Sequence, residues 1–430
     1  MAEFKVSNSY TDSVTIRNAK IEEVETEMAE ALKAIQTKKH ERDIKYLDEL
    51  NSNKGKSAAV FGLHKKVVGS KKSAQEQVAI INPETGNYVY TADEIKKVSL
   101  NYCVHLLRKK EPEGKFKEIV AYNESIHEIR MKEEVDNDIS ELPITTFIKT
   151  WENIKKKSAS KYEFILKGGD SLKSAVLNLC EVIWRTEEIP LKWQESTLIQ
   201  IPKSKGRVGD LDKMRHIHLR HYLCKFFCQL VMAHAKEPIF KKMSKFQIAC
   251  KPGHQASEHL FVIKSVFAYY QTKNKALIMS SFDVKKMFDM ENMYDVCKEL
   301  YKCQVKGKVY RLIFHLNKNL RIKVQTSVGT SASKDTGPTI GQGNVDAGVI
   351  SSVNLDNGVN DAFVDSDGEL NYLELDLGPL LFMDDIFRMG DNVTSAQVAN
   401  DLLEEMIGKK SLEFNLDKSA FMVMGNQKTR

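Results

Sequence analysis

Three aspartates give this sequence its clearest chemical signal. Asp384 and Asp385 are adjacent, with short apolar runs on both sides at residues 380–383 and 386–387. Earlier in the chain, Asp283 ends another apolar run. An apolar stretch that is interrupted by two residues and then resumes predicts a tight hairpin of two buried strands. Two like charges at the tip of such a hairpin raise the free energy of both ionised carboxylates.

A divalent cation is the usual partner that offsets this repulsion, because hard carboxylate oxygens suit Mg²⁺. Three carboxylates on two strands, holding two metal ions, are what in-line phosphoryl transfer onto a nucleic acid requires. The alternative is that the Asp384-Asp385 pair is ordinary turn chemistry, since aspartate is common wherever the chain reverses. The other motifs near these aspartates favour the metal site.

Phe288 lies shortly after Asp283, in the segment 281–289. An aromatic ring at this position can lie under the sugar of an incoming nucleotide, where its bulk leaves no room for a 2′-hydroxyl. Simple core packing is the alternative interpretation of Phe288. For Asp289 we expect a structural role, as the cap of the following helix, rather than metal binding.

A glycine-rich segment, residues 337–343, precedes a helix that we predict at about residues 345–357. Glycines on either side of Gln342 let the backbone approach a ligand closely, and the Gln342 amide can then hydrogen-bond that ligand. A lone Gly-Gln-Gly is usually only a turn. Its position between the two carboxylate segments is what makes it informative.

Basic residues provide the remaining candidates. Lys203 and Arg215 follow the predicted strand 197–201 and can supply the charge-assisted donors that a triphosphate needs, although most such residues are merely surface charges. Lys418 lies in the segment 414–418, just before a terminal apolar strand, and can protonate or neutralise a departing pyrophosphate.

The elements that must position these residues are a mixture of helices and strands after about residue 165. An apolar strand at 276–279 leads into Asp283, and Asp170 is expected to cap the first helix of the series. The predicted helices cover residues 171–186, 222–242, 256–270, 291–302 and 306–317. This mixture predicts an α+β fold, in which a sheet carries helices on one face.

The N-terminal region has a different pattern. Apolar residues at helical spacing predict an amphipathic helix at about residues 21–50, followed by a polar linker at 51–57. The capping-box spacing of Thr91 and Glu94 predicts a second helix, which runs to about residue 110. The basic run at 155–161 is either a solvated face or a contact for phosphates.

The composition sets wider limits. A chain of 430 residues with 42% hydrophobic and 28% charged residues has room for two or three ordinary domains. Its net charge of +6 is compatible with a polyanionic partner but too small to establish one. Seven irregularly spaced cysteines, no apolar run of membrane-spanning length and no signal peptide predict an intracellular protein, nuclear or cytoplasmic and not secreted.

These motifs, in this order, resemble the reverse transcriptase family, and within it the polymerases of non-LTR retrotransposons. The resemblance covers about residues 165–425. Residues 381–385 match the family's (F/Y)xDD signature, residues 189–193 resemble its Ile-Pro…Trp segment, and residues 247–254 resemble its basic glycine-containing segment. Each motif alone is weak, but their joint occurrence in order makes the match specific.

The resemblance implies a right-hand polymerase fold, with a palm and fingers preceded by a mainly helical N-terminal region. It implies RNA-directed DNA synthesis, with an RNA template, a DNA primer and dNTPs as partners and two Mg²⁺ ions, or Mn²⁺, as cofactors. The implied catalytic residues are Asp283, Asp384, Asp385 and Lys418. The implied metal ligands are Asp283, Val284, Asp384 and Asp385, and the implied dNTP-binding residues are Lys203, Arg215, Phe288 and Gln342.

By the same resemblance, residues 1–160 are an N-terminal extension, residues 161–275 the fingers and residues 276–430 the palm. The family's helical thumb has no room after the palm motifs, so we expect a chain truncated before the thumb. The sequence also departs from the family pattern. The usual Tyr-Arg-Pro-Ile-Ser becomes Met-Arg-His-Ile-His at 214–218, and the Gly-Pro-Asp-Gly segment, an endonuclease and an RNase H region are not evident.

Rival interpretations stay open. A catalytically incompetent relic that keeps the fold and binds nucleic acid is favoured by the missing thumb, whereas the carboxylates and Gln342 favour the enzyme. A two-metal nuclease is disfavoured by the Gly-Gln-Gly segment and the basic pair. His218, His221, Cys224 and Cys228 have spacings that allow zinc ligands on one helix face. Small thiols also commonly fill an apolar face, and we favour that interpretation.

Overall fold

The computed structural model describes residues 79–108, 116–135, 138–156, 168–203, 209–363, 370–372 and 375–425, together with Thr26 and Glu30. The helix expected at 21–50 lies outside these residues except for Thr26 and Glu30, which are helical. The linker at 51–57 and the end of the basic run, residues 157–161, also lie outside them.

The chain forms two compact units, which we describe separately. The first comprises residues 1–81, 87–90 and 140–188, and the second comprises residues 82–86, 91–139 and 189–430. The ranges 1–160, 161–275 and 276–430, which the family resemblance implies for an N-terminal extension, fingers and palm, remain a prediction. The described elements of the first unit are the hairpin β1 (Ile80–Ile81) and β2 (Tyr88–Val89) and the helices α5 (Ile144–Lys156) and α7 (Asp170–Thr186).

Helix α7 shows how local sequence sets these elements. It buries one face, on which Leu172, Val176 and Leu179 recur at helical spacing. Gly169, rather than the expected Asp170, is the N-cap residue, and its side chain cannot cap the helix. Asp170 is instead the first helical residue, where its negative charge still favours the helix dipole.

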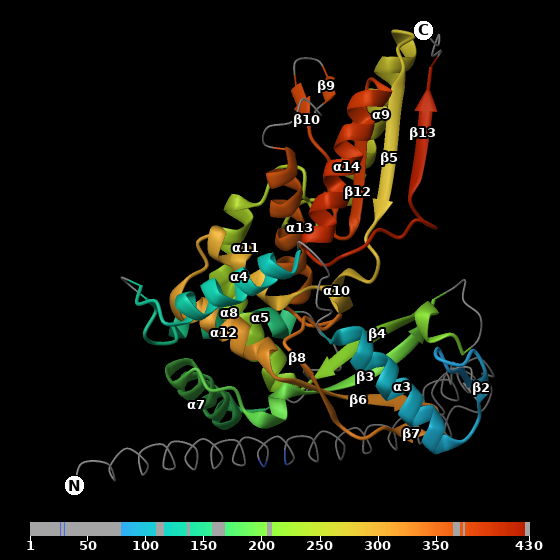
Figure 1. Ribbon diagram of the computed structural model, residues 1–430. Coiled ribbons are helices and arrows are strands. Elements are labelled where there is room, and N and C mark those ends of the chain that lie inside the picture. Colours follow the sequence, from blue (N-terminus) through green and yellow to red (C-terminus); the bar gives the residue numbers. More distant parts are fainter. Residues whose placement is uncertain are drawn as a thin grey trace, which may run out of the picture. The chain divides into compact units, whose positions relative to one another are not determined.

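The second unit contains two sheets, and the first of them we call the palm sheet. It consists of β11 (Leu380–Phe382), β12 (Asp385–Gly390), β5 (Leu277–Asp283) and β13 (Ala420–Met424), in that spatial order. Every neighbouring pair is antiparallel. Figure 1 shows β5, β12 and β13 side by side.

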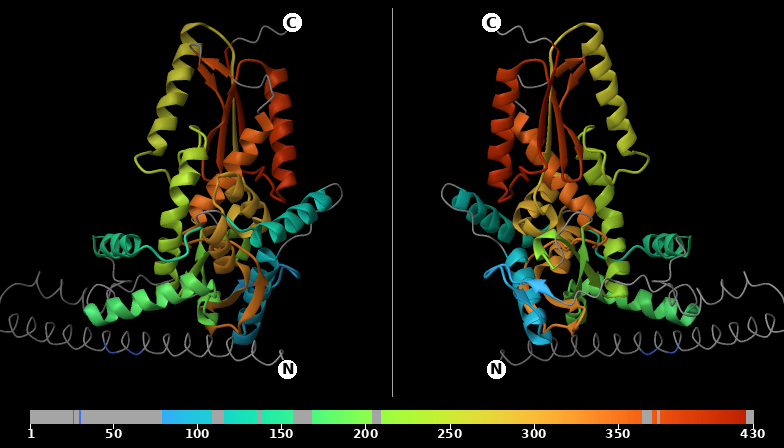
Figure 2. Two further views of the ribbon diagram at one scale, coloured as in Figure 1. Left: turned by 90° about the vertical axis from the view of Figure 1, so that its left-hand side faces the viewer. Right: turned by 90° about the vertical axis from the view of Figure 1, so that its right-hand side faces the viewer.

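Helices cover both faces of the palm sheet. On one face, α9 (Ala256–Thr272) packs Val266 and Tyr270 against Leu277 and Met279 of β5. On the other face lie α13 (Ala347–Phe363) and α14 (Val393–Lys409). Figure 2 shows α9 and α14 on opposite sides of the strands. We expected helices on one face only; because successive strand residues point to opposite faces and both sets are apolar, both faces need cover.

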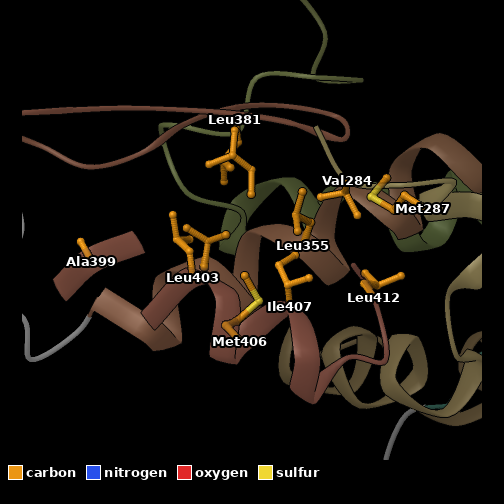
Figure 3. Packing of buried hydrophobic residues seen from close by; sticks show 11 residues of the cluster. Val284, Met287, Leu355, Leu381, Ala399, Leu403, Met406, Ile407 and Leu412 are labelled. Atoms are coloured by element: carbon orange, nitrogen blue, oxygen red, sulfur yellow. The ribbon is translucent and has the colours of Figure 1, made fainter. Parts of the chain in front are cut away.

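The cluster between the palm sheet and α14 forms the core beneath the β11–β12 hairpin. Figure 3 shows Leu381 of β11 above Leu403 of α14, with Val284 and Met287 next to Leu355 of α13. All five of these side chains are at most 1% exposed. The core thus fixes the hairpin and the end of β5 to the same helices.

The other sheet of the second unit we call the fingers sheet. It consists of β4 (Met214–Arg220), β3 (Glu195–Pro202), β6 (Leu320–Thr326) and β7 (Gly329–Thr330), with β8 (Lys334–Gly337) also paired to β6. β3 and β4 are antiparallel, whereas β3 and β6 are parallel.

Helix α3 (Ala92–Leu107) covers the fingers sheet. Its Leu100, Cys103 and Val104 form one buried cluster with Leu198 of β3 and with β6. α3 begins after Thr91, as expected, although the Thr91 hydroxyl bonds the Glu94 side chain (2.6 Å) instead of the backbone. The helix ends at residue 107 rather than near 110.

The remaining helices of the second unit are α4 (Phe116–Met131), η1 (Leu191–Gln194), η2 (Leu211–Lys213), α8 (Tyr222–Lys242), α10 (Met287–Met290), α11 (Met293–Lys302) and α12 (Gly307–Lys318), and a small hairpin of β9 (Leu370–Tyr372) and β10 (Leu375–Leu377) completes the unit. α8, α11 and α12 agree with the helices predicted at 222–242, 291–302 and 306–317, whereas the sequence did not predict α4, α10 and the two short helices η1 and η2. The predicted α+β class is confirmed. Within the described ranges, no helix has the length and apolarity needed to cross a membrane.

Candidate active site

Asp283 and Asp385 face each other on neighbouring strands. They are direct register partners in the antiparallel pair of β5 and β12. The main-chain N–H of Val284 donates to the carbonyl oxygen of Asp384 (3.1 Å). Asp283 and Asp385 are therefore a non-hydrogen-bonded pair, the kind in which Cα atoms approach to about 4.5 Å and side chains lie closest.

Asp384 lies in the turn that joins β11 to β12. Phe382 pairs with Asp385, which leaves Met383 and Asp384 as a two-residue turn. Met383 has a φ of 59°, in the left-handed region that costs a non-glycine residue about 1–2 kcal/mol. The Ser352 hydroxyl of α13 donates to the Met383 sulfur at 3.5 Å and holds the Met383 side chain against α13. The turn is thus a fixed feature that points one carboxylate beyond the strand ends.

The electrostatics of this corner disfavour ionised carboxylates. Burial raises the pKa of Asp384, and the nearby charges of Asp385 and Asp283 raise it further. Burial and Asp283 likewise raise the pKa of Asp385. A bound cation would relieve both effects, since it stabilises the ionised form of each group.

Two side chains after α14 hold Asp283. Lys418 Nζ donates to both carboxylate oxygens, at 2.9 Å each, and Asn415 Nδ2 donates to Oδ2 at 3.0 Å. The Asn415 N–H also donates to the Asp283 carbonyl oxygen at 2.7 Å. Lys418 lies in the site, as the sequence predicts. Asn415 lies in the same segment, 414–418, but the sequence does not indicate its role, because an isolated asparagine there carries no signal of its own.

The donor set has the chemistry of a hard-cation site. Asp283, Asp384 and Asp385 offer carboxylate oxygens, and Val284 can offer only its main-chain carbonyl oxygen. Within the described ranges, no three His, Cys, Asp or Glu side chains are grouped as a ready set of metal ligands. The ammonium of Lys418 instead bonds Asp283, so the metal site remains a prediction.

A cavity of about 1400 Å³ opens beside these carboxylates. Its lining unites residues from both sheets of the second unit. It includes the sequence-predicted Lys203, Arg215, Asp283, Val284, Phe288, Gln342, Asp384 and Lys418. Asp385 is the one predicted site residue outside this lining; it is exposed and lies directly across from Asp283.

The fingers sheet supplies the basic wall of the cavity. Lys203 follows β3, where its N–H donates to the Lys213 carbonyl oxygen (2.9 Å), and Arg215 lies exposed on β4. Burial lowers the pKa of Lys203, and the charges of Lys418, Lys286 and Arg215 lower it further. Cations that repel one another across a cavity favour a polyanionic ligand, because it removes that repulsion.

The Gly-Gln-Gly loop is fixed against β4. The N–H of His218 donates to the carbonyl oxygen of Gln342 (2.8 Å), so the loop continues the hydrogen bonding of the strand. A Cβ on Gly341 would lie 2.6 Å from the His218 ring. Gly343 has a φ of +95°. Both glycines are thus required for the close approach that brings Gln342 to the cavity.

Phe288 combines both interpretations that the sequence left open. It lines the cavity, and it also packs against the cluster that contains Met287. Asp289, expected to cap the next helix, does not do so: Asn292 is the N-cap residue of α11 and accepts from the Tyr294 N–H. Asp289 is instead buried in α10, where burial raises its pKa to about 7. Asn292, rather than Asp289, caps α11 because it immediately precedes the first helical residue, Met293.

These geometric features agree with the sequence comparison. The family model described as reverse transcriptase (RNA-dependent DNA polymerase) matches residues 201–429, more than half of the chain. The chain belongs to the reverse transcriptase family. Its α+β fold is the palm and fingers of that family, with the mainly helical elements α3 and α4 before them.

Solved structures similar to this reverse transcriptase chain include telomerases of two yeasts. Telomerase from Candida albicans, in complex with a TWJ fragment of telomeric RNA, is 11% identical with a TM-score of 0.42, over 87% of this chain and 68% of that one. Apo telomerase from Candida tropicalis, truncated from its C-terminal domain, is 12% identical with a TM-score of 0.42, over 82% and 91%. No curated protein matches the sequence.

Three of the four residues weighed as zinc ligands have other partners in this reverse transcriptase fold. His218 is buried in β4 beside the Ser196 hydroxyl (3.2 Å), and burial lowers its pKa to about 3. His221 caps α8 by accepting from the Leu223 N–H. The Cys224 thiol donates to the Trp193 carbonyl oxygen at 3.8 Å. Their polar atoms serve the packing of β4 and α8.

Proposed function

We propose that this chain is an RNA-directed DNA polymerase of the non-LTR retroelement type, which adds deoxynucleotides to the 3′-hydroxyl of a primer. The observation that carries the proposal is the shared cavity of Asp283 and Asp384 with Lys203, Arg215 and Gln342. Carboxylates on one side and cations on the other fit a substrate that presents both a metal-binding phosphate and further negative charge.

Each residue has a role that follows from its position. Lys203 and Arg215 bind the triphosphate, Gln342 hydrogen-bonds the nucleotide, and Phe288 excludes a 2′-hydroxyl. Asp283, Val284, Asp384 and Asp385 would hold two Mg²⁺ ions, or Mn²⁺, which stabilise negative charge at the reacting phosphate and lower the pKa of the primer hydroxyl.

The side chain of Lys418 lies close to the reacting groups. Its Nζ lies 2.9 Å from both carboxylate oxygens of Asp283, which positions it at the metal-binding edge of the cavity. From there it can neutralise or protonate the departing pyrophosphate. The natural partners we propose are an RNA template, a DNA primer and dNTPs inside the cell.

Primer extension on an RNA template with Mg²⁺ tests the proposal. Wild-type protein should extend the primer, and Asp384→Asn should reduce extension by about three orders of magnitude or more, since it removes charge from the metal-binding edge. The matched control is Asp391→Asn, an exposed carboxylate just beyond the far end of β12. Equal extension by wild type and Asp384→Asn would contradict the assignment.

Folding separates the remaining outcomes. Thermal unfolding of the same three proteins establishes that each is folded. Absence of extension by a folded wild-type chain that still binds an RNA–DNA hybrid would favour the catalytically incompetent relic over the polymerase.

A further inference from the structure

Lys286, beside the cavity, has a strained main chain. It is the N-cap residue of α10, with φ 48° and ψ 41°. This left-handed conformation costs a non-glycine residue about 1–2 kcal/mol. The helix that follows is only four residues long and carries Phe288. Something outside α10 must therefore hold the Lys286 backbone in place, because so short a helix cannot do so alone.

The Lys286 side chain supplies that anchor. Its ammonium donates to Asp212 Oδ1 at 2.5 Å and to the Tyr102 hydroxyl at 2.7 Å. Tyr102 in turn donates to the same Asp212 oxygen at 2.6 Å. The ammonium also lies 5.3 Å from the centre of the Tyr102 ring, within the range of a cation–π contact. The Lys286 side chain is only 14% exposed, so these contacts replace most of its water.

The triangle of Tyr102, Asp212 and Lys286 connects three parts of the second unit. Tyr102 belongs to α3, which lies on the fingers sheet. Asp212 belongs to η2, next to the start of β4. Lys286 precedes the helix with Phe288, and Asp212 and Lys286 both line the cavity. A single side chain, that of Lys286, thus connects Tyr102 to the helix that carries Phe288.

We infer that Tyr102, with Asp212 and Lys286, is a positioning residue for Phe288 and thereby sets the selectivity for deoxyribonucleotides over ribonucleotides. The inference rests on the proposed function of the cavity as a nucleotide site. Tyr102 does not contact the substrate. By holding the Lys286 side chain, it keeps the strained Lys286 backbone in place and so fixes how far the Phe288 ring extends toward the sugar. Loss of this anchor would let the Lys286 backbone relax.

The test measures a ratio, which does not depend on the fraction of active protein. The Kd values of dCTP and CTP, which differ only in the 2′-hydroxyl, are measured for wild type and for Tyr102→Phe, and extension with each nucleotide is measured in parallel. Removing the Tyr102 hydroxyl should narrow the preference for dCTP about five- to tenfold, the size of one typical hydrogen bond. The control is Tyr301→Phe, which also removes a hydroxyl bonded to a carboxylate, that of Glu133, but lies outside the cavity lining.

A double substitution separates positioning from general destabilisation. If Tyr102 acts through Phe288, then Tyr102→Phe should leave the already reduced selectivity of Phe288→Val unchanged. Lys286→Arg, which keeps the cation and its donors, should retain most of the wild-type preference, whereas Lys286→Met should lose it.

Binding and extension distinguish a failed inference from a failed proposed function. Binding that prefers dCTP without any extension would count against the polymerase, while the effect of Tyr102→Phe on the ratio of Kd values would still decide the inference. An unchanged ratio in Tyr102→Phe, or equal binding of dCTP and CTP by wild type, would overturn it.

Discussion

The surroundings of Asp384 disfavour the ionised form of its carboxyl group. Burial, Asp385 and Asp283 raise the pKa of its carboxyl group in the folded chain. A carboxyl group with a raised folded pKa binds its proton more tightly in the folded state, so stability falls as pH rises from the unfolded to the folded pKa. The penalty is therefore larger at neutral pH than in acid, and it is absent below the unfolded pKa.

Asp384→Asn should therefore raise the unfolding temperature in metal-free buffer at pH 7. The gain should disappear near pH 3, where aspartate is protonated in both states and resembles asparagine. Thermal unfolding with EDTA at the two pH values measures both effects. A lower unfolding temperature of Asp384→Asn at pH 7 would show that the carboxylate is a net stabiliser.

Phe288 offers a prediction about substrate choice. Replacing the ring with valine removes bulk at the cavity wall, so Phe288→Val should admit ribonucleotides and reduce the preference for dNTPs by about 10- to 200-fold, the range typical of a changed apolar contact. Competitive primer extension with dCTP and CTP, which differ only in the 2′-hydroxyl, measures the change, and Phe288→Tyr is the conservative control. An unchanged preference would leave Phe288 with its packing role alone.

Single residues were predictable from the sequence where a local pattern marked them. Asp283 and Asp384 interrupt or end apolar runs, so their strand-end positions could be recognised. Tyr102, Asp212 and Asn415 could not, because each acts through a partner distant in the chain, such as Asp283 for Asn415 or Lys286 for Tyr102. Side-chain partners at long range are set by packing, which one sequence does not reveal.

At the scale of elements, the Gly-Gln-Gly loop depends on its fit against β4. The His218 ring that it approaches is fully buried, so it cannot move aside. Gly341→Ala should lower the free energy of unfolding by about 1–3 kcal/mol through overpacking, and should raise the KM for dNTPs by displacing Gln342.

Gly390→Ala is the matched control for this prediction. Its added Cβ would lie 3.8 Å from the nearest atom, an ordinary contact, and its φ is not in the left-handed region. Chemical denaturation and dNTP titration compare the two variants. Equal stability of Gly341→Ala and wild type would contradict the prediction, because it would mean that the His218 ring of β4 can shift to accommodate the added methyl group.

Elements were predicted well where the period of the apolar residues was clear. α8 begins and ends at the expected residues 222 and 242, and the β11–β12 hairpin reverses at the expected place. The sequence did not predict helices on the second face of the palm sheet. A short apolar run shows that a strand is buried, but it does not show which helices pack on each face of that strand. The cap of α11 was misplaced because Asp289 and Asn292 both precede the helix and both can cap.

At the scale of the second unit, a buried polar network joins Glu291, which follows α10, to α11, α13 and the end of α14. Asn354 donates to Glu291 (2.7 Å), Ser351 also bonds Glu291, and Lys410 donates to Asn354 (2.9 Å) and to Glu299 (3.4 Å). Burial raises the pKa of Glu291 to about 7, despite these donors. The helices behind the active-site hairpin are thus held together by a carboxyl group that titrates near neutrality.

This network predicts a pH-dependent stability difference. Because the pKa of Glu291 is raised in the folded state, its ionisation destabilises the protein as pH rises from about 4.5 to about 7, and adds nothing above that. Glu291→Gln removes this effect, so its stability relative to wild type should increase over the same interval and then level off.

The test compares the free energy of unfolding of wild type with that of Glu291→Gln at each pH. His127, His216 and His218 have pKa values lowered mainly by burial, so their effect on stability runs in the opposite direction below about pH 6.5. Urea denaturation of both proteins at several pH values cancels this shared contribution. A constant difference across the interval would mean that Glu291 is ionised throughout.

The parallel pairing of β3 with β6 has a consequence for how the chain acquires its fold. Glu195 pairs with Arg321, and between them the chain leaves the fingers sheet, forms α8 and α9, and lays down β5 in the palm sheet before returning. Contacts so distant in sequence form late, because loop closure must precede them. During synthesis, the edge of β3 that later pairs with β6 therefore stays unpaired until β6 has been made. Until then, this edge can pair with a wrong strand. A fragment of residues 161–275 would keep that edge open permanently, so the fingers can be completed only by a chain that has already built the centre of the palm.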